Sequence, residues 1–296
     1  MKKDHPFRLA DYSDQKDLEL IQLAVNGNRN SLSQLIERHQ QYIYNIALKM
    51  INNVADAEDI TQEILIKLVT NLSKYDSTKG KFRTWLYRIT FNHFLNTKQQ
   101  KYEKLVTGFD VFFNYIEETP EIPLTAIEEA ELQLEIEESK VSCMAGMLMC
   151  LNREQRLIYI VGELFEIDHT LGSEIFEISP ANFRQKLARA RKDLYQWMHN
   201  KCGLVNKENP CRCPKKTKGF IANGWINPKD LKWHSDYQER IKDFSKEKLP
   251  ATLLTVDSIY TSLYKEHPFK ISRNTENIIE KIINNDTLNS TFDLGN

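Results

Sequence analysis

Long stretches of periodically spaced apolar residues restrict the fold of this chain more than any other feature. Between residues 31 and 51, and again between 56 and 72, apolar side chains recur every three or four positions, the period of an amphipathic helix. The turn signal Asn52-Asn53 separates these segments, and Asp56 is a candidate N-cap of the second. The 296 residues include only ten Gly and nine Pro, which favours helices over a turn-rich β architecture. The sequence therefore predicts an all-α protein.

A loop and a third helix follow these two segments. Residues 73–81 have no apolar periodicity and contain Gly80, so they predict a loop. From Phe82 to about Lys101 a helix is expected, in which Trp85 falls on the apolar stripe. Its other faces carry basic and amide side chains.

Charge along the chain is unevenly distributed although the formal net charge is only −1. Residues 81–104 contain six Lys or Arg and one Glu, and residues 181–218 contain eleven Lys or Arg and two acidic residues. Between them, residues 105–139 contain ten acidic residues and no Lys or Arg. Two basic blocks separated by an acidic one indicate two contacts with a polyanion, joined by a connector that avoids it.

Residues 164–195 have the pattern of a helix-turn-helix. A short helix is expected from Asp168 to Phe176, then a turn in which Ser179 is the N-cap and Pro180 the first residue of a second helix. The second helix would bury Phe183, Leu187, Ala190 and Leu194 on one face and leave basic and amide residues on the others. Such a helix can enter a DNA major groove.

This segment resembles region 4 of sigma-70 factors, especially those of the extracytoplasmic-function type. In the N-terminal part, SLSQLIERHQQYIYNIA is similar to region 2.1, DAEDITQEILIKLV to region 2.2, and FRTWLYRITFNHFLNTKQQ to regions 2.3 and 2.4. Two modules in the right order make the resemblance specific, and it covers residues 31–197. It implies a factor that docks on the β′ and β subunits of core RNA polymerase and recognises promoter DNA.

The resemblance assigns roles to three sets of residues. The exposed face of the 56–72 helix would dock on the β′ coiled coil, and the loop and third helix would bind the melted −10 strand. The helix-turn-helix would read the −35 element. The core-binding set is Asp56, Glu58, Asp59, Gln62 and Glu63; the −10 set is Lys79, Lys81, Arg83, Arg88, Asn92, His93, Asn96 and Lys98; the −35 set is Ser179, Asn182, Arg184, Gln185, Lys186, Arg189 and Arg191.

A cysteine cluster follows the helix-turn-helix. His199, Cys202, Cys211 and Cys213 lie within fifteen residues and could hold tetrahedral Zn²⁺, although the spacing departs from paired CxxC motifs. Reduced thiols in a turn and a redox pair are the alternatives. Cys143 and Cys150 lie in an apolar helix and are expected to be packing residues. No cofactor is otherwise required.

The resulting organisation is two helical domains joined by an acidic linker, with a C-terminal extension. The expected boundaries are 1–104, 105–140, 141–200 and 201–296. No apolar run is long enough for a membrane span, so a cytoplasmic protein is expected, and no motif indicates an enzyme. An anti-sigma protein is a further candidate partner. Two other readings stay open: a stand-alone helix-turn-helix regulator, and a metal- or thiol-responsive sensor that uses the cysteine cluster.

Overall fold

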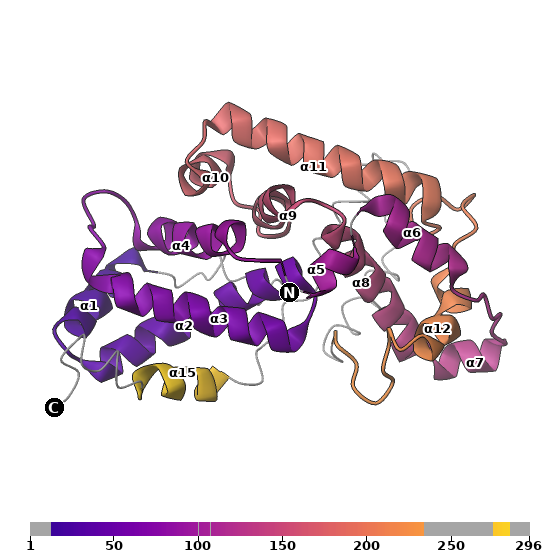
Figure 1. The fold of residues 1–296 in the computed structure, drawn as a ribbon, viewed down its shortest axis with the longest axis horizontal. Helices are drawn as coiled ribbons and strands as arrows, with labels where there is room; N and C mark the ends of the chain where they lie inside the picture. Colours follow the sequence, from indigo (N-terminus) through magenta and orange to yellow (C-terminus); the bar gives the residue numbers. More distant parts are fainter. Residues whose placement is uncertain (1–12, 100, 107, 234–274, 285–296) are drawn as a thin grey trace. The chain divides into compact units, whose positions relative to one another are not determined.

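The computed structural model describes residues 13–99, 101–106, 108–233 and 275–284 (Figure 1). All regular elements in these ranges are helices, and the one β feature there is an isolated bridge between Cys202 and Cys211. The all-α prediction is therefore confirmed. None of the described helices is long and apolar enough to cross a membrane. The chain divides into two compact units, which are described separately.

The first unit comprises residues 1–100, 165–185 and 271–296. Its core lies between α2 and α3, whose predicted apolar stripes are buried, with Ile43 and Ile64 fully inaccessible. The predicted turn at Asn52-Asn53 is confirmed, because Asn52 takes the left-handed conformation that ends α2. Its helices are α1 (Asp14–Val25), α2 (Arg29–Ile51), α3 (Val54–Asn71), η1 (Leu72–Lys74), α4 (Phe82–Asn96), α10 (His169–Phe176), the first residues of α11 (Pro180–Lys201) and α15 (Thr275–Ile283).

A buried carboxylate joins α1 to α2. Asp17 is inaccessible to solvent and accepts hydrogen bonds from Arg38 Nε at 2.7 Å and from His39 Nε2, 2.9 Å away. A buried charge is tolerated when it is paired and hydrogen-bonded, and removing one partner leaves it uncompensated. This cluster fixes α1 against α2.

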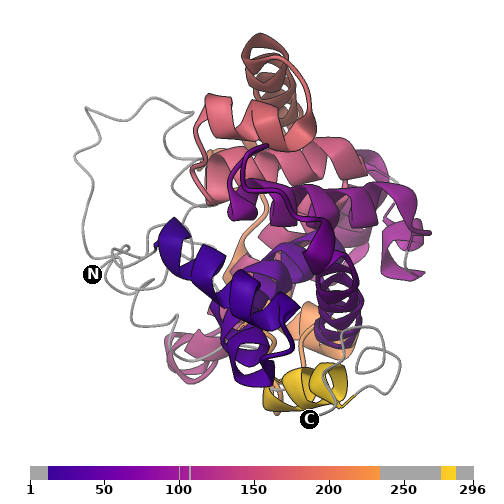
Figure 2. The ribbon, with the colours of Figure 1, turned by 90° about the vertical axis from the view of Figure 1, so that its left-hand side faces the viewer.

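The helix expected to reach about Lys101 is shorter than predicted. It ends at Asn96, because the backbone of Thr97 is extended; the Thr97 hydroxyl donates to the His93 carbonyl at 2.7 Å. In the same unit, α15 packs along α2 and α3 (Figures 1 and 2). Its Ile278 and Ile282 side chains are buried.

The second unit comprises residues 101–164 and 186–270. The acidic stretch from 105 to 140, expected to begin as a linker, carries a helix at Phe109–Glu118 and packs against the segment that follows α11. Lys216, 5% exposed in its side chain, donates to the Thr119 carbonyl at 2.6 Å, and Lys218 pairs with Glu128 at 2.6 Å. Its helices are α5 (Lys101–Leu105), α6 (Phe109–Glu118), α7 (Ala126–Glu131), α8 (Gln133–Met149), α9 (Arg153–Tyr159), η2 (Ile160–Leu164), the rest of α11 and α12 (Cys213–Ala222).

Residues 201–233, the first described part of the extension, fold onto α8. The backbone N–H groups of Lys232 and Trp233 donate to the buried Glu138 carboxylate at 2.8 and 3.0 Å, and the Trp233 ring is buried. Four further aromatic residues of the extension, Tyr237, Tyr260, Tyr264 and Phe269, lie outside the described residues.

Candidate nucleic-acid interface

The acidic face of α3 is assembled as the sequence predicts. Asp59 and Glu63 are exposed one turn apart, and Asp56, Glu58 and Gln62 are partly exposed beside them. Asp56 does not cap the helix, however. The Asn53 side chain accepts from the Asp56 N–H at 3.0 Å, so α3 begins at Val54. Asp56 instead places its carboxylate in the first turn, where the positive end of the helix dipole favours it.

His93 lies inside the α3–α4 packing. It is 3% exposed, with Nδ1 2.9 Å from Lys67 Nζ and Nε2 3.5 Å from the Glu63 carboxylate. The imidazole therefore links the two helices in this conformation. Of the residues in the predicted −10 set, His93 is the least accessible to solvent.

The loop between α3 and α4 is held by its own side chains. Tyr75 donates its hydroxyl to the Gly80 carbonyl at 3.0 Å, and Asp76 accepts from the N–H and hydroxyl of Thr78 at 3.0 and 2.7 Å. The two Thr78 hydrogen bonds hold the pKa of Asp76 below its usual value. Lys79 and Lys81 extend from this loop with side chains 82% and 73% exposed, so both amines can reach a backbone phosphate.

An aromatic cluster forms the base of the loop. The Tyr75 ring lies 5.3 Å from Phe82 and 5.4 Å from Trp85, and Phe82 lies 5.7 Å from Trp85. Trp85 is partly buried, in agreement with its predicted place on the apolar stripe. Sequence reasoning missed Tyr75, although an aromatic residue within a polar loop is itself a signal.

Amide and basic side chains cover the outer face of α4. Asn92, Asn96 and Lys98 are exposed, and Arg83 donates to the Tyr87 hydroxyl at 3.2 Å.

Arg88 contacts α10 within the same unit. Its guanidinium donates to the Glu174 carbonyl at 3.0 and 2.8 Å and lies 3.4 Å from the Glu177 carboxylate. Phe91 of α4 stacks on Phe176 of α10 at 5.0 Å.

The helix-turn-helix forms where the sequence predicts, although α11 continues to Lys201 and Asp168 is a cap rather than the first helical residue. Asp168 caps α10 by accepting from the N–H groups of Thr170 and Leu171, and Ser179 caps α11 by accepting from the Asn182 N–H at 3.1 Å. A Cβ added at Gly172 would lie 2.5 Å from the Phe183 ring. The close approach of α10 to the start of α11 therefore requires glycine at position 172.

The residues of α11 fall into two groups. Phe183, Leu187, Ala190 and Leu194 are buried as predicted, while Arg184, Gln185 and Arg189 are exposed. Asn182 is partly exposed. Two predicted −35 residues have protein partners: Lys186 lies 2.9 Å from Glu154, and Arg191 Nε donates to the buried Glu163 at 2.6 Å. The exposed residues of the predicted −35 set on α11 thus lie in its first three turns.

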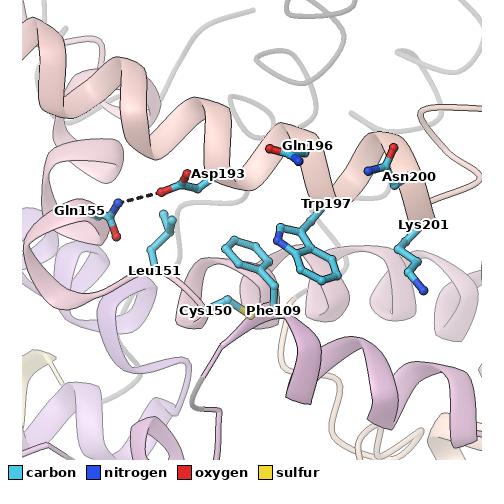
Figure 3. Close-up of a pocket in the computed structure, with 9 residues that line it drawn as sticks. All are labelled: Phe109, Cys150, Leu151, Gln155, Asp193, Gln196, Trp197, Asn200 and Lys201. Atoms are coloured by element: carbon cyan, nitrogen blue, oxygen red, sulfur yellow. Dashed lines mark hydrogen bonds between the residues drawn. The ribbon is translucent and has the colours of Figure 1, made fainter.

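Two pockets accompany these helices, one in each unit. In the first, a pocket of about 520 Å³ brings Lys81 and Arg83 together with Asp168 and Glu174. In the second unit, a pocket of about 510 Å³ lies along the last turns of α11 (Figure 3). In its lining, Trp197 stacks on Phe109 with ring centroids 5.6 Å apart, and Gln155 donates to Asp193 at 2.9 Å. Its lining contains none of the predicted −35 residues.

The proposed zinc ligands are not assembled as the sequence predicted. His199 is exposed on α11. Across residues 13–99, 101–106, 108–233 and 275–284, no group of three or more His, Cys, Asp or Glu side chains is arranged to hold a metal ion. The structure therefore does not support His199 as a ligand, because the helix turns its side chain to solvent.

Comparisons with known proteins agree with the N-terminal module. Residues 35–102 match the family model for Sigma-70 region 2. The chain is 35% identical over 72 residues to the ECF RNA polymerase sigma factor SigW of Bacillus subtilis (strain 168), covering 24% of this chain and 38% of that one. It is 26% identical over 164 residues to the ECF RNA polymerase sigma factor SigM of the same organism, covering 55% and 93%.

A third relative has a similarly short match. The ECF RNA polymerase sigma factor SigE of Mycolicibacterium smegmatis is 35% identical over 71 residues, 24% of this chain and 27% of that one. The chain thus spans about a third of the length of SigW and SigE, whereas its alignment with SigM covers nearly all of SigM.

Proposed function

We propose that this chain is a sigma-70 family member of the extracytoplasmic-function type and acts as a sigma factor that directs RNA polymerase to promoters. The observation that carries the proposal is the presence, in one chain, of a match to region 2 and a capped helix-turn-helix. The α3–α4 module lies within the match to region 2, and α10 and α11 form a capped helix-turn-helix. A polymerase-docking face and a groove-reading helix are both needed for promoter-specific initiation.

In the proposed mechanism, the acidic face of α3 docks on core polymerase. Asp59 and Glu63 offer carboxylates one helical turn apart, which suits an arginine-bearing partner helix. The stripe behind them is buried, so this face keeps its geometry when a partner binds. The amines of Lys79 and Lys81 and the face of α4 then hold the melted −10 strand, as cationic grooves with nearby aromatic rings generally do for single strands.

The start of α11 would read the −35 duplex. Arg184, Gln185 and Arg189 are exposed on its first three turns, and Arg and Gln side chains make bidentate contacts to guanine and adenine in the major groove. Lys186 and Arg191, which already pair with carboxylates, would contribute to phosphate contacts after exchanging partners. The capped N-terminus of α11 positions all of these groups.

The test is transcription in vitro with purified core polymerase and a promoter library. We expect promoter-specific transcripts with the wild-type protein and none with D59K/E63K, because reversed charges repel a basic docking helix. Glu19→Lys is the matched control, since Glu19 is an exposed carboxylate on α1 of the same unit, and it should retain activity. Absence of specific initiation by the wild-type protein with several core polymerases would refute the proposal.

A second class of protein, the stand-alone helix-turn-helix regulator, predicts a different outcome. Such a protein binds its operator without polymerase and is insensitive to D59K/E63K. Electrophoretic shift of duplex DNA with the protein alone, compared with the polymerase complex, separates the two. Arg184→Ala should weaken either kind of duplex binding, with exposed Lys192 of the same helix as the matched control.

A further inference from the structure

Residues 165–177 lie against the face of α4 that carries predicted −10 residues. This covering segment consists of the approach to α10, α10 itself and its C-cap residue, and it belongs to the same compact unit as α4. It contains four acidic residues and no Lys or Arg. Arg88 of α4 donates to the Glu174 carbonyl and lies beside the Glu177 carboxylate. An acidic segment of the chain thus occupies a basic face whose proposed role is to bind a DNA strand.

Aromatic contacts anchor both ends of the covering segment. At its start, Phe165 is 1% exposed, and its ring lies 5.1 Å from that of Tyr42 in α2. At its end, the Phe176 ring stacks on Phe91 of α4 with centroids 5.0 Å apart. Aromatic pairs at these separations contribute stability beyond the area that they bury. The two anchors therefore make this a specific contact.

Between the anchors the two surfaces are polar and incompletely packed. A pocket of about 520 Å³ has Lys81 and Arg83 on one side and Asp168 and Glu174 of the covering segment on the other. A polar space of this size admits water. The carboxylates face cations that would otherwise hold phosphates. Because the middle of the contact is solvated, the two surfaces can separate without opening the buried core of the unit.

The distance between the two promoter elements requires this contact to open. The Phe176 ring also lies 5.8 Å from Phe183 in α11, so one side chain separates α4 from the start of the helix proposed to read the −35 element. The −10 and −35 elements lie about 25 base pairs apart, which is about 85 Å along a duplex. While α10 is docked on α4, the two modules cannot reach both elements of one promoter.

We propose that residues 165–177 are an intramolecular competitor of single-stranded DNA for the basic face of α4. This inference rests on the proposed function, because it takes α4 to be the strand-binding helix. The closed form withholds that face, so the affinity of the free chain for a strand falls in proportion to the fraction of open molecules. By linkage, a bound strand weakens the docking of α10 by the same factor.

The first test is hydrogen–deuterium exchange of the full-length chain, measured by mass spectrometry with and without a single-stranded DNA oligonucleotide of random sequence. No polymerase is needed. We expect the oligonucleotide to slow exchange in α4 and to speed exchange in α10, since a displaced helix loses the packing that protects its amides. A strand that binds beside a permanently docked α10 would leave exchange in α10 unchanged or slower, and this result would overturn the proposal.

Two variants that weaken the docking should bind the oligonucleotide more tightly than the wild type does. Phe176→Ala removes the stack on Phe91 without changing the net charge, and Glu177→Lys places a second cation beside Arg88. We expect each to lower the dissociation constant at least about threefold, because a larger fraction of the molecules is open. The matched charge control is Glu208→Lys, at an exposed carboxylate of the second unit, which should bind as the wild type does.

Circular dichroism checks that the variants are folded, and the exposed Glu177 position keeps the test valid if Phe176→Ala unfolds α10. The proposal is also overturned if folded Glu177→Lys binds no more tightly than Glu208→Lys, or if neither the wild type nor any variant binds the oligonucleotide. A failure to direct transcription would refute the proposed function and leave the competition intact. Promoter-specific transcription without faster exchange in α10 would reject the competition alone.

Discussion

The Arg88 guanidinium is joined to the backbone carbonyl of Glu174 by two hydrogen bonds, 3.0 Å from Nε and 2.8 Å from Nη2. This carbonyl lies in the last turn of α10, where the helix dipole is negative and attracts a cation. Arg88 also belongs to the predicted −10 set. The Glu174 carbonyl and the Glu177 carboxylate occupy the guanidinium on the α10 side, so a DNA strand would compete with these contacts for its N–H donors.

Arg88→Ala should therefore weaken binding of the polymerase complex to a single-stranded −10 oligonucleotide. We expect about a tenfold loss, since a hydrogen bond to a charged group contributes about 1.5–3 kcal/mol. The salt dependence of binding should also become shallower by about one unit of slope. Glu177→Gln, which removes only an exposed partner of Arg88, should bind at least as well as the wild type. Equal affinity of Arg88→Ala and wild type would remove Arg88 from the −10 set.

Gly172→Ala should destabilise the helix-turn-helix. The added methyl group would lie 2.5 Å from the Phe183 ring, and overpacking of this kind costs about 1–3 kcal/mol. Urea denaturation monitored by circular dichroism measures the change in the free energy of unfolding. Shrinking the opposing side chain in Gly172→Ala/Phe183→Leu should recover part of the loss. If the double variant is less stable than the sum of the single changes, the steric explanation is wrong.

Much of the architecture could be predicted from the sequence because its signals are local. The period of the apolar residues predicted α2, α3 and α11, and the cap residue Ser179 predicted the start of α11. These features depend on neighbours three or four positions away. The earlier end of α4 has no such local signal, because nothing in the apolar pattern marks the extended backbone at Thr97.

Long-range pairings could not be predicted in the same way. The acidic stretch looks like a solvated connector until Lys216 and Lys218, some hundred residues later, are placed against Thr119 and Glu128. His93 appears free on a helical wheel, yet it is buried because Lys67 and Glu63 of α3 face it.

Lys49 gives a prediction about pH. It is 1% exposed, and burial lowers its pKa from 10.5 to about 7. The unfolded chain therefore binds one more proton than the folded chain between these two values, so this group's contribution to stability improves as the pH rises from 7 to 10. Below pH 7 the buried Lys49 amine is charged, so its burial lowers the free energy of unfolding most in that range.

Lys49→Met should consequently stabilise the protein, and more at pH 6 than at pH 9.5. We expect a gain above about 1 kcal/mol at pH 6, since one unit of pKa difference corresponds to about 1.36 kcal/mol. The free energy of unfolding in urea, measured for both proteins at both pH values, checks this. The exposed Lys16 of α1 provides the control, and Lys16→Met should show no such pH dependence. A loss of stability at pH 6 would show that the partners of Lys49 outweigh its desolvation.

Glu103 joins α5 to α9 through a buried ion cluster. Its carboxylate, with a side chain 1% exposed, accepts from Arg153 at 2.9 and 2.5 Å and from Arg156 at 3.2 Å. Arg156 also donates to the carbonyls of Leu148, Met149 and Leu151, which closes the end of α8. Burial lowers the pKa of Arg156 to about 10, although Glu103 opposes this shift. The Glu103 carboxylate therefore stabilises the charged form of the buried guanidinium.

Glu103→Gln should therefore cost about 3–5 kcal/mol of stability, because it leaves two guanidinium groups without their buried counter-charge. The matched control is Glu154→Gln, whose carboxylate is 45% exposed and pairs with Lys186 in solvent. A surface pair of this kind contributes at most about 1 kcal/mol. Denaturant unfolding of the two variants should separate them clearly, and equal losses would mean that solvent reaches the Glu103 cluster. Added salt should weaken only the Glu154 pair, since buried charges are screened less than exposed ones.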